Sequence, residues 1–191
     1  MASNSANLDE ARATELEGEI DSFAVNPKLY AQLRRFCCGS SEHRSEREVN
    51  RIVREYASGR HRDGTFRVTV ERRRLIGVAA FRAATASHPD LGPYAGSPYI
   101  CVLGVSEQYR GCTMAGRRLG DLILEDALGA INACWRDTPQ VFALVNPNNA
   151  HGRNLFERNG FRMIVPARRN GETDALFRRS GGEQRDGRNE T

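Results

Sequence analysis

The sequence Tyr99-Ile-Cys-Val-Leu-Gly-Val-Ser-Glu-Gln-Tyr-Arg-Gly-Cys-Thr-Met-Ala115 joins two regular patterns through a short turn. Tyr99 to Val105 is a continuous apolar run, which is typical of a buried central strand. The apolar spacing that begins near Thr113 predicts a long helix packed on a sheet. A strand that enters a helix through a short turn aims unpaired N–H groups and the positive helix end at one point. The stretch therefore predicts a site for a phosphate or pyrophosphate.

Three residues of this stretch have special roles in that prediction. Arg110 would add a charged, forked donor, and Gly111 would let the backbone approach a ligand closely. Gly104 lies inside the strand near its end, where a glycine marks a bulge or a close approach. Turns of this kind often bind nothing, so the turn alone leaves a purely structural role open.

The turn resembles the pyrophosphate loop of the GNAT superfamily, the acyl-CoA-dependent N-acetyltransferases, which reads Arg/Gln-x-x-Gly-x-Gly/Ala. Arg110 and Ala115 match this loop, while Thr113 stands where the family normally has glycine. Threonine disfavours positive φ, so either the turn has helical dihedral angles at Thr113 or the cofactor binds more weakly than usual.

A second block, Asn149-Ala-His-Gly-Arg-Asn-Leu-Phe-Glu-Arg-Asn-Gly-Phe161, resembles the family's Asn-x-x-Ala-x-x-Leu-Tyr-x-x-x-Gly-Phe. Asn149, Leu155, Gly160 and Phe161 match in place, and Gly152 stands where alanine is usual. The tyrosine, which can protonate the departing CoA thiolate in the family, is replaced by Phe156, which has no proton to give. A helix cap at Asn149 and a core role for Phe156 would also explain the block without a ligand.

With both blocks in order, the resemblance covers roughly Phe66 to Phe177. It implies direct acetyl transfer from acetyl-CoA, as co-substrate, to a primary amine, without a metal. The residues that it places at the co-substrate are Leu103, Gly104, Val105, Arg110, Gly111, Cys112, Thr113, Met114, Ala115, Asn149 and Phe156. Among these, the backbone N–H groups of the strand end at residues 103–105 would face the thioester oxygen.

The catalytic groups are not identified by the sequence. Tyr99 is a candidate base acting through water, or simply an aromatic residue on a sheet face. Glu107 lies near the predicted loop, although a solvated or capping carboxylate explains it equally well. Cys112 invites a covalent acyl-enzyme if a helix N-terminus lowers the pKa of its thiol, but no histidine has a defined place beside it.

Composition limits the class of protein. The chain has 191 residues and a net charge of +4, and Lys28 is its only lysine. It has no long apolar run and no signal-peptide pattern at its start, so we expect a cytoplasmic protein that does not enter membranes. Its five cysteines form no C-x-x-C pair, which fits a reducing cytosol and does not fit a zinc site.

The expected architecture is an α/β domain with a mixed central sheet flanked by helices. We expect a flexible tail over residues 1–20, one N-acetyltransferase domain over 21–179 and a disordered tail over 180–191. Within the domain, the pattern predicts helices at 26–38, from Ser45 to Ala57, from near Thr113 to Cys134 and after Asn149. Ser45-Glu-Arg-Glu48 has the form of a capping box at the start of the second helix. The predicted strands are 65–71, 75–81, 99–105, 140–145, 161–165 and 174–178, with a long loop over 83–98. The first two form a hairpin with its turn at Arg72 and Arg73, and the second of them is expected to be buried on both faces.

Several alternatives remain open. Phe36-Cys-Cys-Gly39 is similar to an element of toxin-like GNAT enzymes that act on aminoacyl-tRNA, so tRNA is a possible acceptor. An arginine-rich nucleic-acid-binding module is the rival from another class, and a GNAT-like domain that binds CoA without catalysis is the third. The acceptor, a small-molecule or peptide amine, and the oligomeric state are not indicated by the sequence.

Overall fold

The computed structural model describes residues 15–16, 19–39, 43–60, 64–136, 140–146, 148–169 and 172–180, with the side chains of 166–169 and 172–173 excepted. Residues 1–14 of the predicted N-terminal tail and 181–191 of the predicted C-terminal tail lie outside this part of the chain.

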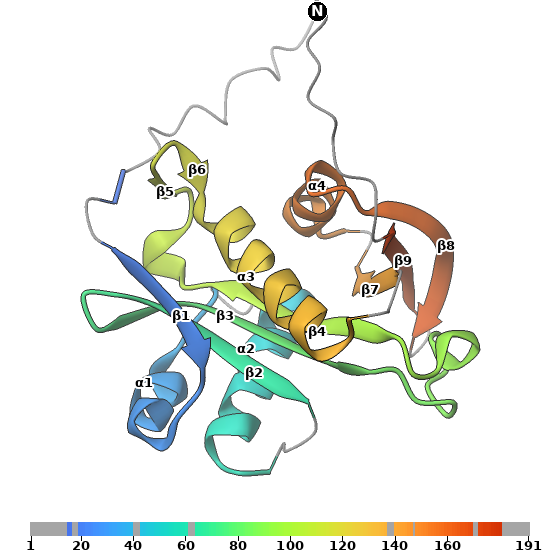
Figure 1. Cartoon of the computed structure of the whole chain (residues 1–191), viewed down its shortest axis with the longest axis horizontal. Helices are drawn as coiled ribbons and strands as arrows, with labels where there is room; N and C mark the ends of the chain where they lie inside the picture. Colours follow the sequence, from blue (N-terminus) through green and yellow to red (C-terminus); the bar gives the residue numbers. More distant parts are fainter. Residues whose placement is uncertain are drawn as a thin grey trace, which may run out of the picture. The chain divides into compact units, whose positions relative to one another are not determined.

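Strands, α-helices and short 3₁₀ helices (η) follow one another as coloured in Figure 1. Their bounds are β1 (Ile20–Ala24), η1 (Pro27–Leu29), α1 (Tyr30–Arg35), α2 (Arg44–Ala57), β2 (Thr65–Glu71), β3 (Arg74–Ala83), η2 (Gly92–Tyr94), β4 (Pro98–Val105), η3 (Glu107–Tyr109), β5 (Thr113–Met114), β6 (Arg117–Arg118), α3 (Leu119–Cys134), β7 (Gln140–Val145), α4 (Ala150–Arg158), β8 (Arg162–Arg169) and β9 (Glu172–Ser180).

A seven-stranded mixed sheet has the order β1-β2-β3-β4-β7-β9-β8. β1 is antiparallel to β2, and β9 is antiparallel to both β7 and β8. β4 is parallel to β7, with Tyr99 opposite Phe142 and Ile100 opposite Ala143. The predicted α/β architecture with a mixed sheet is therefore confirmed. β5 and β6 form a separate two-stranded hairpin.

The chain divides into two compact units. One contains the described residues up to Ala80 together with Val102–Gly129, and the other contains Phe81–Cys101 together with the described residues from Ala130 onward. Strands β3 and β4 run through both units, so the division does not follow element boundaries.

In the first unit, two glycines show how α2 and α3 pack. A Cβ on Gly77 of β3 would lie 2.1 Å from Cδ1 of Ile123 in α3. A Cβ on Gly104 of β4 would lie 2.9 Å from Cγ1 of Val49 in α2 and 3.5 Å from Cγ2 of Val78. Because neighbouring residues of a strand face opposite sides, α3 covers the Gly77 face of β3 and α2 covers the Val78 face. Gly104 therefore marks a close approach, by the side chain of Val49.

In the second unit, aromatic rings form much of the core. The ring of Phe156 in α4 lies 5.0 Å from that of Phe161 and 6.3 Å from that of Phe177. The predicted loop between β3 and β4 is compact: the Ala84 N–H donates to Ser97 O at 2.8 Å, and the Tyr94 ring lies 4.4 Å from the Phe142 ring.

The hairpin β2–β3 confirms its prediction. Arg72 and Arg73 form its tight turn, with φ of 47° and 68°. Residues Ile76 to Phe81 are all buried, as expected for a strand covered on both faces.

Two local predictions in the N-terminal half are corrected, and one strand is added. The first helix ends at Arg35, because Phe36 is extended. The second helix begins at Arg44 and has no side-chain cap, so the predicted capping box at Ser45 does not form. Its glutamate, Glu48, instead accepts from Arg51 at 2.7 Å, one turn further along the helix. Strand β1 was not predicted; it is short and only half-buried.

Two further findings concern the described residues. No helix among them is both long and apolar enough to cross a bilayer. Lys28 is exposed in η1, where Asn26 Oδ1 accepts a hydrogen bond from its backbone N–H at 3.0 Å.

The packing of Gly77 can be tested by a double-mutant cycle. Gly77→Ala should lower the free energy of unfolding by about 1–3 kcal/mol, because the added methyl overpacks against Ile123. Ile123→Val removes Cδ1 and should cost about 0.5–1.5 kcal/mol alone. If the contact is as described, the double variant measured by urea denaturation should lose less than the sum. Strict additivity would contradict it.

Candidate active site

The predicted phosphate turn does not lead directly into a helix. Thr113 and Met114 pair with Arg118 and Arg117, and α3 begins only at Leu119. Ala115 and Gly116 form the two-residue turn, with φ of 49° and 70°. Positive φ at both residues is the geometry of a tight hairpin turn and cannot continue an α-helix. The predicted helix start near Thr113 is therefore wrong, since the helix begins only after the hairpin.

A carboxylate occupies the donors of this hairpin, which we call the 113–116 hairpin. Glu15 Oε2 accepts from Thr113 Oγ1 at 2.5 Å, and Oε1 accepts from the Gly116 N–H at 3.3 Å. The chain runs alongside here, because the Leu16 N–H donates to Thr113 O at 2.8 Å. These hydrogen bonds, led by that of Thr113 and assisted by the Gly116 and Ala115 N–H groups, lower the pKa of Glu15.

Arg110 is held by an ion pair to a buried carboxylate. Its guanidinium nitrogen Nη2 lies 2.5 Å from Glu46 Oε1 and also donates to the backbone carbonyl of Cys38. The Glu46 side chain is 11% exposed, whereas that of Arg110 is 48% exposed. Glu46 Oε2 is buried and, within the described part of the chain, has no hydrogen-bond partner. Arg110 is therefore the cation of a buried carboxylate, a role that competes with contacting a phosphate.

The same ion pair fixes the segment Phe36-Cys-Cys-Gly39. Cys38 N–H donates to Asn50 Oδ1 of α2 at 3.0 Å, while its carbonyl accepts from Arg110. A Cβ on Gly39 would lie 2.4 Å from the Glu46 carboxylate and 2.5 Å from Arg110 Nη2, so the ion pair needs glycine here. The segment, with Phe36, Cys38 and Gly39 buried, has a clear structural role.

The end of β4 lies beside this network. The Ser106 N–H donates to Ile76 O at 2.8 Å, and the Glu107 N–H donates to Cys37 O at 2.9 Å. The Glu107 side chain is exposed, with Oε2 3.8 Å from Cys37 Sγ. Glu107 therefore links η3 to the segment after α1.

The two buried cysteine thiols near this site, those of Cys38 and Cys112, are poor nucleophiles. Cys112 is 7% exposed and precedes β5, not a helix. Burial raises the pKa of its thiol, and burial raises that of Cys38 to about 12. The idea of an activated Cys112 at a helix N-terminus is therefore wrong.

Tyr99, in the second unit, is 4% exposed and packs in a cluster with Leu91, Phe142 and Leu176. Its hydroxyl accepts from Arg82 Nε at 2.5 Å, and the His88 ring meets its ring edge at 5.6 Å. The Tyr99 hydroxyl therefore has a structural partner inside this cluster.

The two special residues of the α4 block have structural partners. Asn149 Oδ1 caps the helix by accepting from the Gly152 N–H at 2.9 Å. A Cβ on Gly152 would lie 2.6 Å from Asn149 Nδ2, which explains why glycine stands where the resembled family has alanine. Phe156 is 7% exposed within the aromatic core.

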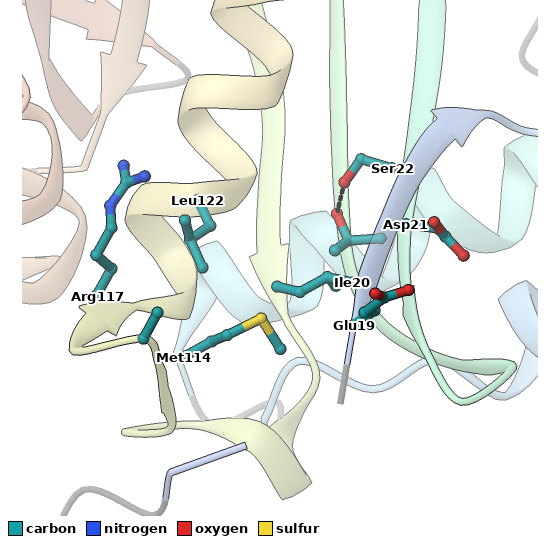
Figure 2. Close-up of a pocket in the computed structure, with 9 residues that line it drawn as sticks. Glu19, Ile20, Asp21, Ser22, Met114, Arg117 and Leu122 are labelled. Carbon is teal, nitrogen blue, oxygen red and sulfur yellow. Dashed lines mark hydrogen bonds between the residues drawn. The ribbon is translucent and has the colours of Figure 1, made fainter. Parts of the chain in front are cut away.

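An open hollow of about 530 Å³ adjoins the 113–116 hairpin in the first unit. Figure 2 shows Ile20 of β1 and Met114 of β5 pointing toward each other across it, with Leu122 of α3 beside them. The hydroxyls of Ser22 and Thr69 form a hydrogen bond of 3.0 Å at its edge. Arg117, also at the edge, pairs with Glu125 at 2.6 Å. The hairpin is thus open to solvent on this side.

Sequence reasoning missed two residues of this region, Glu15 and Glu46. Glu15 contacts the hairpin across 98 residues of sequence, so no local pattern reveals it. Glu46 shares a buried helix face with Asn50, Val53 and Ala57. Its immediate neighbours in the sequence are charged or polar, so the local pattern reads as a solvated face. Within the described residues, no group of three or more His, Cys, Asp or Glu side chains is arranged to hold a metal ion.

Comparison with known proteins supports the fold. No protein-family model matches the chain, and no curated protein matches it in sequence. The structure is similar to an acetyltransferase of the GNAT family from Streptococcus pneumoniae, at 14% identity over 86% of this chain and 100% of that one, with a TM-score of 0.61.

It is also similar to NAA60 of Arabidopsis thaliana in complex with a bisubstrate analogue, at 18% identity over 86% and 99% of the two chains, with a TM-score of 0.61. The aminoglycoside acetyltransferase AAC(6')-Ib in complex with coenzyme A gives 15% identity over 85% and 95%, with a TM-score of 0.63. The chain has the GNAT fold, as the resemblance in sequence implied.

The role of Arg110 is testable by stability. Removing one partner of a buried ion pair costs about 3–5 kcal/mol; because Arg110 is half-exposed, we expect Arg110→Ala to cost about 1–3 kcal/mol, measured by urea denaturation. In a Glu46→Gln background, where the charge is gone, the same substitution should cost less. An Arg110→Ala variant as stable as the unmodified protein would refute the internal role.

The role of Phe156 is testable by adding one hydroxyl. Phe156→Tyr should lower the free energy of unfolding by about 1–3 kcal/mol, since the core offers the new hydroxyl no partner. Phe23→Tyr makes the same change at a half-buried position of β1 and should be nearly neutral. Equal melting temperatures for the two variants would place the Phe156 ring edge at solvent or at a ligand.

Proposed function

We propose that this chain is an N-acetyltransferase that transfers the acetyl group of acetyl-CoA directly to a primary amine. The observation that carries the proposal is the GNAT fold, shared over 85% of the chain with an aminoglycoside acetyltransferase that holds coenzyme A. The two sequence blocks that resemble the family lie, in order, at the strand β4 end with the 113–116 hairpin and at α4.

The 113–116 hairpin is the part of the proposed site that suits the pyrophosphate of the co-substrate. Its donors already hold one anion, the Glu15 carboxylate, which stands in for a phosphate oxygen pair. Thr113 supplies a hydroxyl where the family has glycine. The residues with positive φ are Ala115 and Gly116, and Thr113 is not one of them. Gly111, Cys112 and Met114 would contribute backbone, and Arg110 would contribute mainly by holding the loop in place.

Two further parts of the proposed site come from β4 and α4. The backbone N–H groups at Leu103, Gly104 and Val105 are proposed to stabilise the negative charge that develops on the thioester oxygen. In the resembled family the asparagine at this position contacts the pantetheine arm of the co-substrate. Because Asn149 uses Oδ1 for its cap, we propose that its Nδ2 group donates to that arm. Phe156 would pack beneath the co-substrate without donating a proton.

The chemistry joins the amine nitrogen to the acetyl carbon and breaks the bond from that carbon to sulfur. The amine loses a proton and the departing thiolate gains one. Because Phe156 has no proton to give, we propose that the sulfur is protonated by water or by the amine itself. Tyr99 and Glu107 stay the two candidates for the base: the Tyr99 hydroxyl accepts from Arg82 Nε, and the Glu107 carboxylate accepts from the thiol of Cys37.

The acceptor is proposed to be a small-molecule or peptide amine, with the amine of aminoacyl-tRNA as the third class. The acceptor classes separate in one screen with labelled acetyl-CoA. Transfer to small amines or peptides but not to aminoacyl-tRNA would remove the toxin-like alternative. Phe36-Cys-Cys-Gly39, which suggested that alternative, is explained by its structural role around Glu46.

Binding of acetyl-CoA is the first test. At a hundred times its Kd, a ligand of the folded state should raise the free energy of unfolding by about 2.7 kcal/mol, read as a higher melting temperature. ATP at equal concentration controls for phosphate binding alone. No shift with acetyl-CoA, together with salt-dependent retention on RNA, would favour an arginine-rich nucleic-acid-binding module. Binding without transfer to any amine would indicate a CoA-binding domain without catalysis.

A further inference from the structure

The anion-binding donors of the 113–116 hairpin are already occupied by a side chain of the same protein. Glu15 reaches them because Glu15 and Leu16 run parallel to Thr113, as the short blue segment beside β5 and β6 in Figure 1 shows. The carboxylate receives one hydroxyl and at least one backbone N–H. A phosphate that binds these donors therefore has to take them from Glu15.

The geometry of the turn explains why it attracts anions. Successive residues at positive φ, here Ala115 and Gly116, turn neighbouring backbone N–H groups toward a common point. Such concave arrangements of N–H groups bind anions. Alanine in this conformation is disfavoured by about 1–2 kcal/mol, and the contact with a negative group on the N–H side offsets part of that cost.

A ligand could readily displace the Glu15 carboxylate from the 113–116 hairpin. Glu15 is exposed, its chain contact is a single bridge, and the hollow of Figure 2 opens the hairpin to solvent at Met114 and Ala115. A carboxylate carries one negative charge, whereas a pyrophosphate carries more charge and more acceptor oxygens. The exchange therefore replaces a weaker anion by a stronger one at the same donors.

We propose that Glu15 is an internal competitor for the anion site of the 113–116 hairpin, and that the pyrophosphate of the co-substrate binds by displacing its carboxylate. This regulation rests on the proposed function, since it concerns the same site. The carboxylate keeps the hairpin folded when no ligand is bound, and it lowers the apparent affinity for the ligand by the fraction of molecules in which it is seated.

The test compares two single-charge variants, Glu15→Gln and Glu19→Gln. The first substitution keeps the length of the side chain and removes the charge that competes. Glu19 is exposed in the same stretch and lines the hollow, so its variant controls for the general loss of a negative charge near the ligand. Circular dichroism verifies that both variants fold.

Calorimetric titration at low salt with coenzyme A, and separately with inorganic pyrophosphate, gives the readout. If nine-tenths of the molecules hold Glu15 in place, its removal should tighten the Kd by about tenfold, and a half-occupied contact by about twofold. We expect a gain in this range for Glu15→Gln with both ligands, and a clearly smaller change for Glu19→Gln.

The outcomes separate this inference from the proposed function. Equal Kd values for coenzyme A in the unmodified protein and both variants would overturn the competition and leave the proposed function standing. Tighter pyrophosphate binding in Glu15→Gln, with no coenzyme A binding in any variant, would support the competition and count against the proposed function. Failure of every variant to bind either ligand would overturn both.

Discussion

A buried carboxylate needs a cation. In the first unit, Arg110 supplies that cation to Glu46, and several neighbouring residues hold the pair in place. Arg110 arrives from the turn after β4, and its guanidinium joins the Glu46 carboxylate to the carbonyl of Cys38. Gly39 leaves room for the pair, and Asn50 secures the backbone on the other side. Because an unpaired buried charge is so costly, these contacts fix the loop after β4 to α2. The arginine that a motif would assign to the ligand is committed to the fold, and ligand binding would depend on it indirectly.

Much of the fold could be predicted from the sequence because it is encoded locally. The apolar runs that became β2, β3, β4 and β7, and the Asn149 cap of α4, depend on residues within a few positions of one another. The start of α3 was misplaced because the helical spacing continues backward through Thr113, whereas the pairing of Thr113 with Arg118 decides the local backbone. The capping box at Ser45 was misread for a similar reason: Arg51 competes successfully for Glu48.

The candidate site was predicted less completely, because its contacts link distant parts of the chain. The motif pointed to the hairpin that holds the Glu15 carboxylate, but it could not show the partners: that of Arg110 lies 64 residues away and that of Thr113 lies 98 residues away. At α4 each residue has the structural role that the sequence also allowed: Asn149 caps the helix, and Phe156 packs against Phe161 and Phe177. A functional role for either has to be compatible with that structural one, which is why the proposed site uses the amide group of Asn149 and only the ring face of Phe156.

The distribution of cations has a consequence for chemical modification. Lys28, exposed in η1, carries the only ε-amine in the chain, and every other basic side chain except histidine is a guanidinium. Guanidinium groups keep their charge at all physiological pH values and are poor targets for acylation. The positive surface of this protein is therefore insensitive to activated acyl groups in its surroundings. A label directed at ε-amines would mark one defined position, in η1 just before α1.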